Sequence, residues 1–180
     1  MVASNPTTEL CAAFSSPDAG AVPWSDALRS LAEAEIFWLS TVRPDNRPHV
    51  TPLLGVWTDS SFYFCTGAQE RKARNLAVNA SCTVTTGRNT LDGLDIVVEG
   101  ESRIVEDRAE RHATAGAFER KYRSHFTSPE GTWAGLGESM RGGHVLVYRM
   151  VPSVVFGFAM GAVYGQTRWT FADESTATTP

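Results

Sequence analysis

The chain has 180 residues, 42% of them hydrophobic, and its formal net charge at pH 7 is −4. This length fits one domain and leaves little room for a second, and the composition allows a single core to form without disulfides or metals. The small negative charge argues against general nucleic-acid binding, because that activity needs a basic surface that displaces counterions.

The cysteines and the hydropathy of the chain bear on its compartment. Cys11, Cys65 and Cys82 are odd in number and lack C-x-x-C spacing, so neither a disulfide framework nor a zinc site is expected. No apolar run is long enough to cross a bilayer, and the N-terminus lacks the pattern of a secretory signal. We therefore expect a cytoplasmic protein without membrane contact, in a reducing environment.

The two ends of the chain lack hydrophobic periodicity. Residues 1–22 are rich in Ser, Ala, Thr and Pro, and we expect them to form a flexible N-terminal arm. Residues 173–180 are expected to form a flexible tail. The cofactor-binding domain predicted below therefore spans residues 23–172.

A helix followed by a run of strands opens the domain. The segment Pro23-Trp24-Ser25-Asp26 is typical of a helix start with Ser25 or Asp26 as the cap, and the helix is expected to run to about Glu35. Aromatic and β-branched residues predict strands at 36–42, 49–57 and 62–65, separated by short polar turns. Trp38 and Trp57 are expected in the core.

The middle of the chain alternates between helices and strands. Thr66-Gly67-Ala68-Gln69 matches a capping box that would open a helix with Thr66 as its cap. Strands are predicted at 82–86 and 94–105, the second with a bulge or a close backbone approach at Gly100. A further capping pattern, Asp107 to Glu110, opens a long second helix of this region.

The last third of the chain contains a glycine-rich connection, Ser124 to Gly143, which we expect to be a loop that covers the substrate. Strands are predicted at 144–150, 154–159 and 166–171. In total, seven or eight strands with hairpin connections predict a mainly β fold, an antiparallel barrel that is closed or partly closed and carries peripheral helices.

Several familiar catalytic motifs are absent. Gly135-Leu136-Gly137 begins like a dinucleotide fingerprint, but Met140 replaces the third glycine. The sequence has no phosphate loop, no nucleophile elbow and no H-E-x-x-H. Its four histidines lack paired spacing, so no metal site is expected, and no catalytic residue can be assigned. An enzyme of this kind must take its reactivity from a cofactor.

Three stretches in the same order resemble one known family. They are RPHVTPL at 47–53, FYFCT at 62–66 followed by RKARNL at 71–76, and VVEGE at 97–101. Together with YRMVP at 148–152 and TRWTF at 167–171, they resemble the pyridoxamine 5'-phosphate oxidase-like, flavin-binding split-barrel family. The resemblance implies an antiparallel split β-barrel with flanking α-helices, and a homodimer with the cofactor at the interface.

The resemblance also implies a cofactor, either FMN or the deazaflavin coenzyme F420, and a set of residues that hold it. Thr66 and Lys72 would bind the phosphate at a helix N-terminus, where free N–H groups favour an anion, and Arg71 and Arg74 would assist. The alternative for these basic residues is a solvated helix face. Asn75 is expected to tie the helix to a neighbouring strand.

Two further strands complete the predicted cofactor site. The edge of the flavin ring would lie along His49, Val50, Thr51 and Pro52, whose alternative role is an ordinary strand surface. Arg168 and Trp169 would approach the cofactor of the partner subunit, with a place in the core as the alternative for Trp169.

The predicted function is therefore that of a flavin- or deazaflavin-dependent oxidoreductase, which transfers a hydride to or from a small organic substrate. The alternative is a non-catalytic module of the same fold that binds flavin or haem. In the haem case His49 or His144 would have to supply the axial ligand.

Overall fold

The computed structural model describes residues 5–88 and 90–171. Its strands are β1 (Thr7–Leu10), β2 (Phe37–Val42), β3 (Pro48–Leu53), β4 (Gly55–Thr58), β5 (Ser61–Thr66), β6 (Ser81–Thr85), β7 (Gly93–Ile104), β8 (Leu146–Met160) and β9 (Gly165–Thr170). The helices are a 3-10 turn η1 (Ala12–Phe14), then α1 (Trp24–Glu33), α2 (Arg71–Leu76), α3 (Arg108–Tyr122), α4 (Ser124–Thr127) and α5 (Leu136–Gly142).

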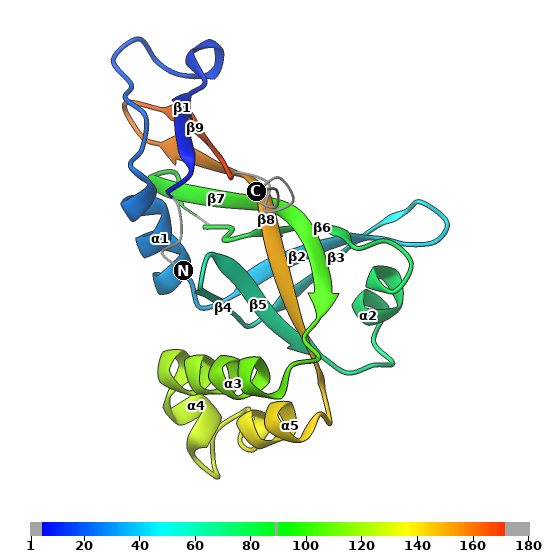
Figure 1. Ribbon diagram of the computed structural model, residues 1–180. Coiled ribbons are helices and arrows are strands. Elements are labelled where there is room, and N and C mark those ends of the chain that lie inside the picture. Colours follow the sequence, from blue (N-terminus) through cyan, green and yellow to red (C-terminus); the bar gives the residue numbers. More distant parts are fainter. Residues whose placement is uncertain (1–4, 89, 172–180) are drawn as a thin grey trace, which may run out of the picture.

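The strands form one antiparallel sheet that curls into a split barrel (Figure 1). The strand order along its main path is β1-β9-β8-β7-β6-β2-β3. The first part of β8 also pairs with β5, and β5 pairs with β4 on its other side. β3 and β4 are separated only by Leu54, yet β3 pairs with β2 and β4 pairs with β5. The sheet is therefore open between β3 and β4, which confirms the predicted mainly β, antiparallel split barrel.

The helices flank this barrel. Helices α3, α4 and α5 gather at one end, whereas α2 lies beside β2 and β3 (Figure 1). The capping pattern that opens α3 is confirmed, because the Asp107 carboxylate accepts the backbone N–H of Glu110 at 2.7 Å. The cap of α1 is Pro23 rather than Ser25 or Asp26, since the helix begins at Trp24, two or three residues earlier than those caps imply. None of the helices within the described residues is long and apolar enough to cross a membrane.

The apolar side chains form two clusters. The first fills the barrel with Phe37, Leu39, Phe62 and Trp169 among its fully buried members, and the second lies between α3 and the sheet around Phe118. Alternation along β2 sends Phe37 and Leu39 inward and leaves Trp38 outside, 42% exposed. The prediction of a core position was therefore wrong for Trp38, whereas Trp57 packs against the first cluster.

The irregularity predicted at Gly100 is present, with the bulge on the facing strand β8, where Ser153 is the extra residue. The register between β7 and β8 shifts between Glu99 and Gly100, and Pro152 of β8 lies opposite Gly100. A side chain at Gly100 would overlap the carbonyl oxygen of Val151. Because a bulge tolerates a residue without an N–H, Pro152 does not end the strand. The two strands predicted at 144–150 and 154–159 are therefore one strand, β8.

Three further predictions need correction. The strand predicted at 49–57 is divided at Leu54 into β3 and β4, because the barrel splits there. The N-terminal segment is not entirely a flexible arm, because β1 pairs with β9 along its full length. The glycine-rich connection contains α4 and α5, and α5 packs on α3 through Arg141 and Glu119. The predicted tail at 173–180 lies outside the described residues.

Candidate functional site

Strand β3 lies at an edge of the sheet and presents most of its predicted cofactor-binding residues to the surroundings. Val50 and Pro52 are exposed, and His49 and Thr51 are half-buried. Prolines lack the N–H that a central strand needs, so Pro48 and Pro52 suit an edge. The sequence therefore places a free strand edge where a ligand can pair with the backbone.

The helix start predicted at Thr66 was wrong. Thr66 is the last residue of β5, and α2 begins at Arg71 after Glu70, with no side-chain cap. The hydroxyl of Thr66 donates to the carbonyl of Gly67 at 3.5 Å instead of capping a helix. Thr66 therefore does not lie at the helix N-terminus where it was predicted to bind a phosphate.

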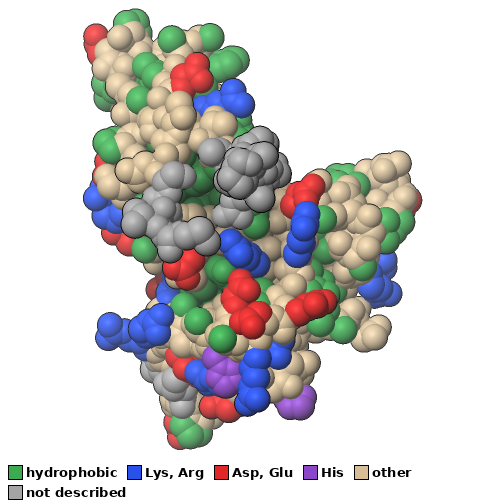
Figure 2. All heavy atoms as spheres, viewed as in Figure 1, with side chains coloured by type: hydrophobic (Ala, Val, Ile, Leu, Met, Phe, Trp, Pro, Cys, Tyr) green, Lys and Arg blue, Asp and Glu red, His purple; other side chains and the backbone are tan. Residues whose placement is uncertain are grey.

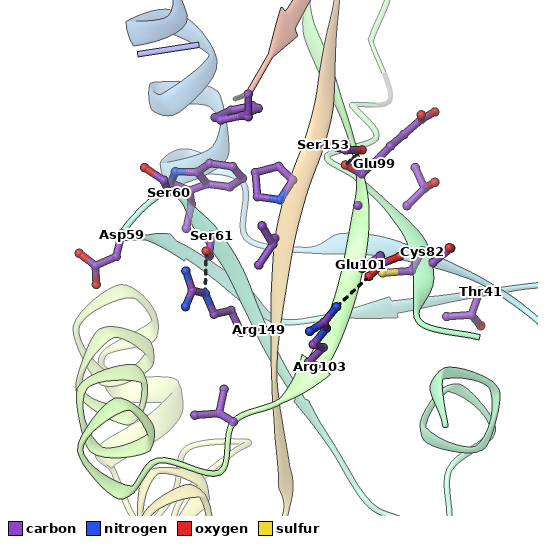
Figure 3. Close-up of a pocket in the computed structure, with 18 of the residues that line it drawn as sticks. Thr41, Asp59, Ser60, Ser61, Cys82, Glu99, Glu101, Arg103, Arg149 and Ser153 are labelled. Carbon is purple, nitrogen blue, oxygen red and sulfur yellow. Dashed lines mark hydrogen bonds and ion pairs between the residues drawn. The ribbon is translucent and has the colours of Figure 1, made fainter. Parts of the chain in front are cut away.

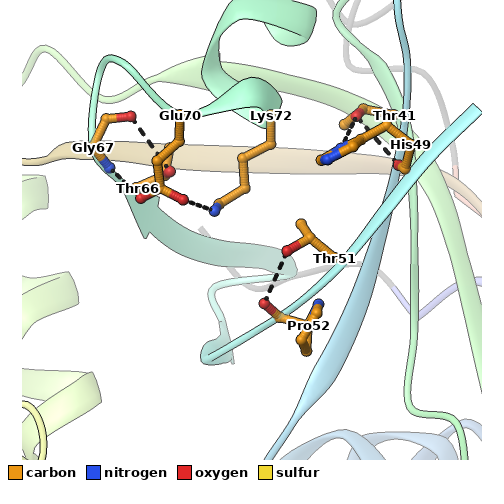
Figure 4. Close-up of polar contacts among 8 residues, drawn as sticks. All are labelled: Thr41, His49, Thr51, Pro52, Thr66, Gly67, Glu70 and Lys72. Carbon is orange, nitrogen blue, oxygen red and sulfur yellow. Dashed lines mark hydrogen bonds and ion pairs between the residues drawn. The ribbon is translucent and has the colours of Figure 1, made fainter.

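Lys72 is the buried member of the predicted basic set. Its ammonium pairs with the Glu70 carboxylate, which also accepts the backbone N–H of Gly67 at 2.9 Å. Figure 4 shows Lys72 of α2 reaching the carboxylate of Glu70, the residue before the helix, with Thr51 and Pro52 of β3 on the other side of Lys72. Arg71 and Arg74 are exposed, in keeping with the alternative of a solvated helix face.

Asn75 has the structural role that the sequence predicted. Its side chain is fully buried, and its amide nitrogen donates to the Thr41 hydroxyl at 2.9 Å. Thr41 also lies 3.4 Å from the imidazole Nδ1 of His49, its register partner on β3. This chain of contacts fixes α2 against β2 and places His49 next to the helix (Figure 4).

A group of basic side chains surrounds His49. Burial lowers the pKa of His49, and the positive charges of Arg43, Lys72 and Arg71 lower it further. The Nε of Arg43 is buried and has no hydrogen-bond partner among the described residues. We call Arg43, His49, Arg71 and Lys72 the basic cluster. It has the charge and the free donor that an anion needs.

Arg43 was missed by the sequence analysis. It follows β2 directly and lies in the turn that leads into β3, where its backbone N–H donates to the carbonyl of Arg47. The only feature of the sequence that could have indicated Arg43 is its position in the same turn as Arg47. Arg47 itself is exposed and pairs with Asp45, so sequence proximity alone does not separate the two arginines.

Arg168 and Trp169 lie on β9, apart from the basic cluster of the same chain. Trp169 is fully buried and its ring contacts Trp24, with 5.5 Å between centroids, which is the core position named as the alternative. Arg168 is exposed on the opposite face of β9, across from Glu9 of β1. Within one chain, the structure does not bring these two residues to the predicted cofactor site.

A wide groove of about 2040 Å³ runs across the sheet and reaches Thr41 and Pro48 at one end. Acidic and basic side chains are interspersed on this face, with hydrophobic ones between them (Figure 2). Within the groove, Arg149 donates to the Ser61 hydroxyl at 2.9 Å and Arg103 pairs with Glu101 (Figure 3). Acidic side chains outnumber basic ones in the lining of the groove, so it is less suited to an anion than the basic cluster is.

A smaller pocket of about 270 Å³ lies at the split of the barrel. It shares two of the predicted cofactor-binding residues, Pro52 and Lys72. Its other lining residues are Ile36, Leu53, Leu54, Cys65, Trp133 and Leu136. Across the part of the chain that the structure describes, no three His, Cys, Asp or Glu side chains are grouped so that they could hold a metal ion.

Comparison with known proteins identifies the family. The model of the family described as pyridoxamine 5'-phosphate oxidase matches residues 25–149, which is more than half of the chain. The protein therefore belongs to the pyridoxamine 5'-phosphate oxidase family, as the sequence motifs predicted. No curated protein matches the sequence.

Solved structures show the same fold at low sequence identity. A conserved hypothetical protein from Mycobacterium tuberculosis has a TM-score of 0.61 at 17% identity, covering 88% of this chain and 91% of its own. An F420 reductase has a TM-score of 0.54 at 20% identity, covering 71% and 93%. A haem storage protein from Vibrio cholerae has a TM-score of 0.56 at 15% identity, covering 79% and 93%. The fold therefore occurs in proteins whose names refer to different cofactors.

Proposed function

We propose that this protein is an oxidoreductase that binds FMN or the deazaflavin coenzyme F420 between β3 and α2. The observation that carries the proposal is the basic cluster, in which the buried Nε of Arg43 lacks a partner beside His49, Lys72 and Arg71. Both cofactors carry a phosphate, which such a cluster can bind through charge-assisted hydrogen bonds.

Different residues would bind different parts of the cofactor. Arg43 and Lys72 would bind the phosphate, and the exposed edge of β3 around Val50 would offer backbone groups to the polar edge of the ring. The low pKa of His49 keeps its imidazole neutral at pH 7, so that it can donate or accept a hydrogen bond. When bound, the cofactor supplies the hydride chemistry for which the chain has no residues of its own.

A second copy of the chain would complete the site. Trp38 is 42% exposed and Val50 is 55% exposed, on neighbouring strands at the open edge of the sheet. Exposed apolar side chains near the edge of a sheet favour association. We propose a homodimer that covers this face, and Arg168 of the partner subunit would then be free to approach the cofactor.

Binding of FMN, F420 and haem to the purified protein, measured by calorimetry and absorbance, tests the proposal. We expect one flavin-type cofactor per chain. Arg43→Ala should weaken its binding about 10- to 100-fold, since hydrogen bonds to charged groups contribute about 1.5–3 kcal/mol. Lys72→Met should also weaken it, whereas Arg29→Ala, an exposed arginine of α1, should not.

Each other outcome has a defined meaning. Binding of haem alone would favour the non-catalytic module, and binding of none of the three ligands would refute the proposal. Sedimentation of the wild type and of Trp38→Asp tests the dimer: we expect a dimer that the variant dissociates. A monomeric wild type would contradict this part of the proposal.

A further inference from the structure

The pocket at the split exists because the barrel does not close there. β3 ends at Leu53 and β4 begins at Gly55, and neither strand pairs with the other. Leu53, Leu54, Cys65 and Pro52 line the gap between them. Because no hydrogen bonds join β3 to β4, an opening remains between them, and side chains form its walls.

The lining of this pocket is almost entirely apolar. Six of its eight residues are apolar, and the remaining two are Lys72 and Cys65. The ammonium of Lys72 is paired with Glu70, and burial raises the pKa of the Cys65 thiol to about 12, so that the thiol is neutral at pH 7. The pocket therefore favours an uncharged ligand, because its apolar walls would remove the hydration of a charged one.

The size of the pocket limits the size of the ligand that it can hold. Its volume is about 270 Å³. An apolar cavity of about 150 Å³ in another protein stays dry and binds benzene. The pocket at the split can therefore hold one or two fused rings, and it is too small for a complete flavin cofactor with its phosphate and side chain.

Trp133 is the aromatic residue in the lining of the pocket. It belongs to the connection between α4 and α5, and its backbone N–H donates to the carbonyl of His125 at 2.8 Å. The imidazole of His125 meets the Trp133 ring edge-on, with 6.5 Å between centroids. The Trp133 side chain remains 38% exposed and Ile36 beside the pocket remains 42% exposed. Such incompletely covered apolar surface next to a pocket is available to stack on a flat ligand.

We propose that this pocket binds a flat, uncharged ring of the substrate, and that Trp133 determines this specificity. The proposal rests on the proposed cofactor site, because Pro52 and Lys72 border both. A ring held between Trp133 and Leu54 would lie directly beside the cofactor edge on β3. The glycine-rich connection, through Trp133 and Leu136, thus contributes part of the substrate-binding surface.

The test uses 2-naphthol as an uncharged probe and 2-naphthoate as a charged probe with the same rings. Calorimetry on the full chain without cofactor should show one 2-naphthol per chain and weaker binding of 2-naphthoate. Trp133→Ala should weaken 2-naphthol binding about tenfold, a loss of the size expected for an aromatic contact. Trp133→Phe should restore most of the affinity, and Phe14→Ala, a 68% exposed control in η1, should leave it unchanged.

Separate titration with FMN and F420 distinguishes this proposal from the cofactor proposal. We expect Trp133→Ala to keep the cofactor affinity of the wild type, and Arg43→Ala to keep its 2-naphthol affinity. Absence of 2-naphthol binding, or equal binding by Trp133→Ala, would overturn the substrate pocket. Competition between 2-naphthol and the cofactor would also overturn it, because the cofactor ring would then occupy the pocket itself. If the wild-type protein binds 2-naphthol but neither FMN nor F420, the proposed oxidoreductase function is refuted, whereas the apolar binding pocket is not.

Discussion

Tyr122 makes a buried hydrogen-bonded contact that holds β4 at the split. Its hydroxyl accepts the backbone N–H of Gly55 at 2.9 Å and lies 2.9 Å from the carbonyl of Gly55 and 3.0 Å from that of Glu35. Tyr122→Phe removes the acceptor and leaves the Gly55 N–H buried. The Gly55 carbonyl keeps a donor, because the ammonium of Lys121 lies 3.0 Å away.

The cost of this change follows from one unsatisfied group. A buried donor without a partner costs about 1–3 kcal/mol. For a domain of this size, 1 kcal/mol corresponds to about 2–4 °C in Tm. We therefore expect Tyr122→Phe to lower the Tm by about 2–12 °C. Urea denaturation followed by far-UV circular dichroism should show a lower midpoint with an unchanged slope m.

A control variant distinguishes the effect of losing the buried hydrogen bond from the effect of removing any tyrosine hydroxyl. Tyr164 is 51% exposed in the β8–β9 connection. Tyr164→Phe should change the free energy of unfolding by less than about 0.5 kcal/mol, as is usual for surface substitutions. Equal stability of Tyr122→Phe and the wild type would show that the Gly55 N–H finds another partner, and the reasoning would be refuted.

Three further substitutions test other parts of the fold. Burial lowers the pKa of the Lys121 ammonium from 10.5 to about 8. As the pH rises, the folded chain therefore loses this proton at a lower pH than the unfolded chain does. Stability should therefore rise with pH between these two values, and Lys121→Met should flatten this rise in pH-dependent urea titrations. Arg141 binds Glu119 in a bidentate pair that lowers the carboxyl pKa. Glu119→Gln should cost about 1–2 kcal/mol at pH 7, and the cost should fade as the pH falls through the folded-state pKa. Gly100→Ala should destabilise by about 1–3 kcal/mol in thermal melts, because its new Cβ would overlap Val151.

Controls for these substitutions come from the same chain. Glu101→Gln removes an exposed ion pair with Arg103 and should be nearly neutral, in contrast to Glu119→Gln. Gly20→Ala adds a methyl group where the surroundings are open, in contrast to Gly100→Ala. An identical pH dependence in Lys121→Met and the wild type would contradict the assignment of the rise to Lys121. Equal melting of Gly100→Ala and the wild type would show that β8 can move away.

Much of the fold could be predicted from local patterns. Aromatic and β-branched residues identified β2, Gly100 marked the irregular pairing of β7 with β8, and the Asp107 pattern identified the start of α3. These features depend on neighbours along the chain, so their physical causes are visible in the sequence. The split was not visible, because nothing local to Leu54 states that β3 will pair with β2 and β4 with β5.

The candidate site shows the same division. The sequence by itself determined the family and pointed to β3 and to Lys72. Only the tertiary structure brought Arg43 to His49, moved the start of α2 away from Thr66, and placed Trp133 beside Pro52. The physical reason is that strand pairing decides these contacts. Residues far apart in the chain meet when hydrogen-bonded ladders form between strands, and local propensity does not record which ladders will form.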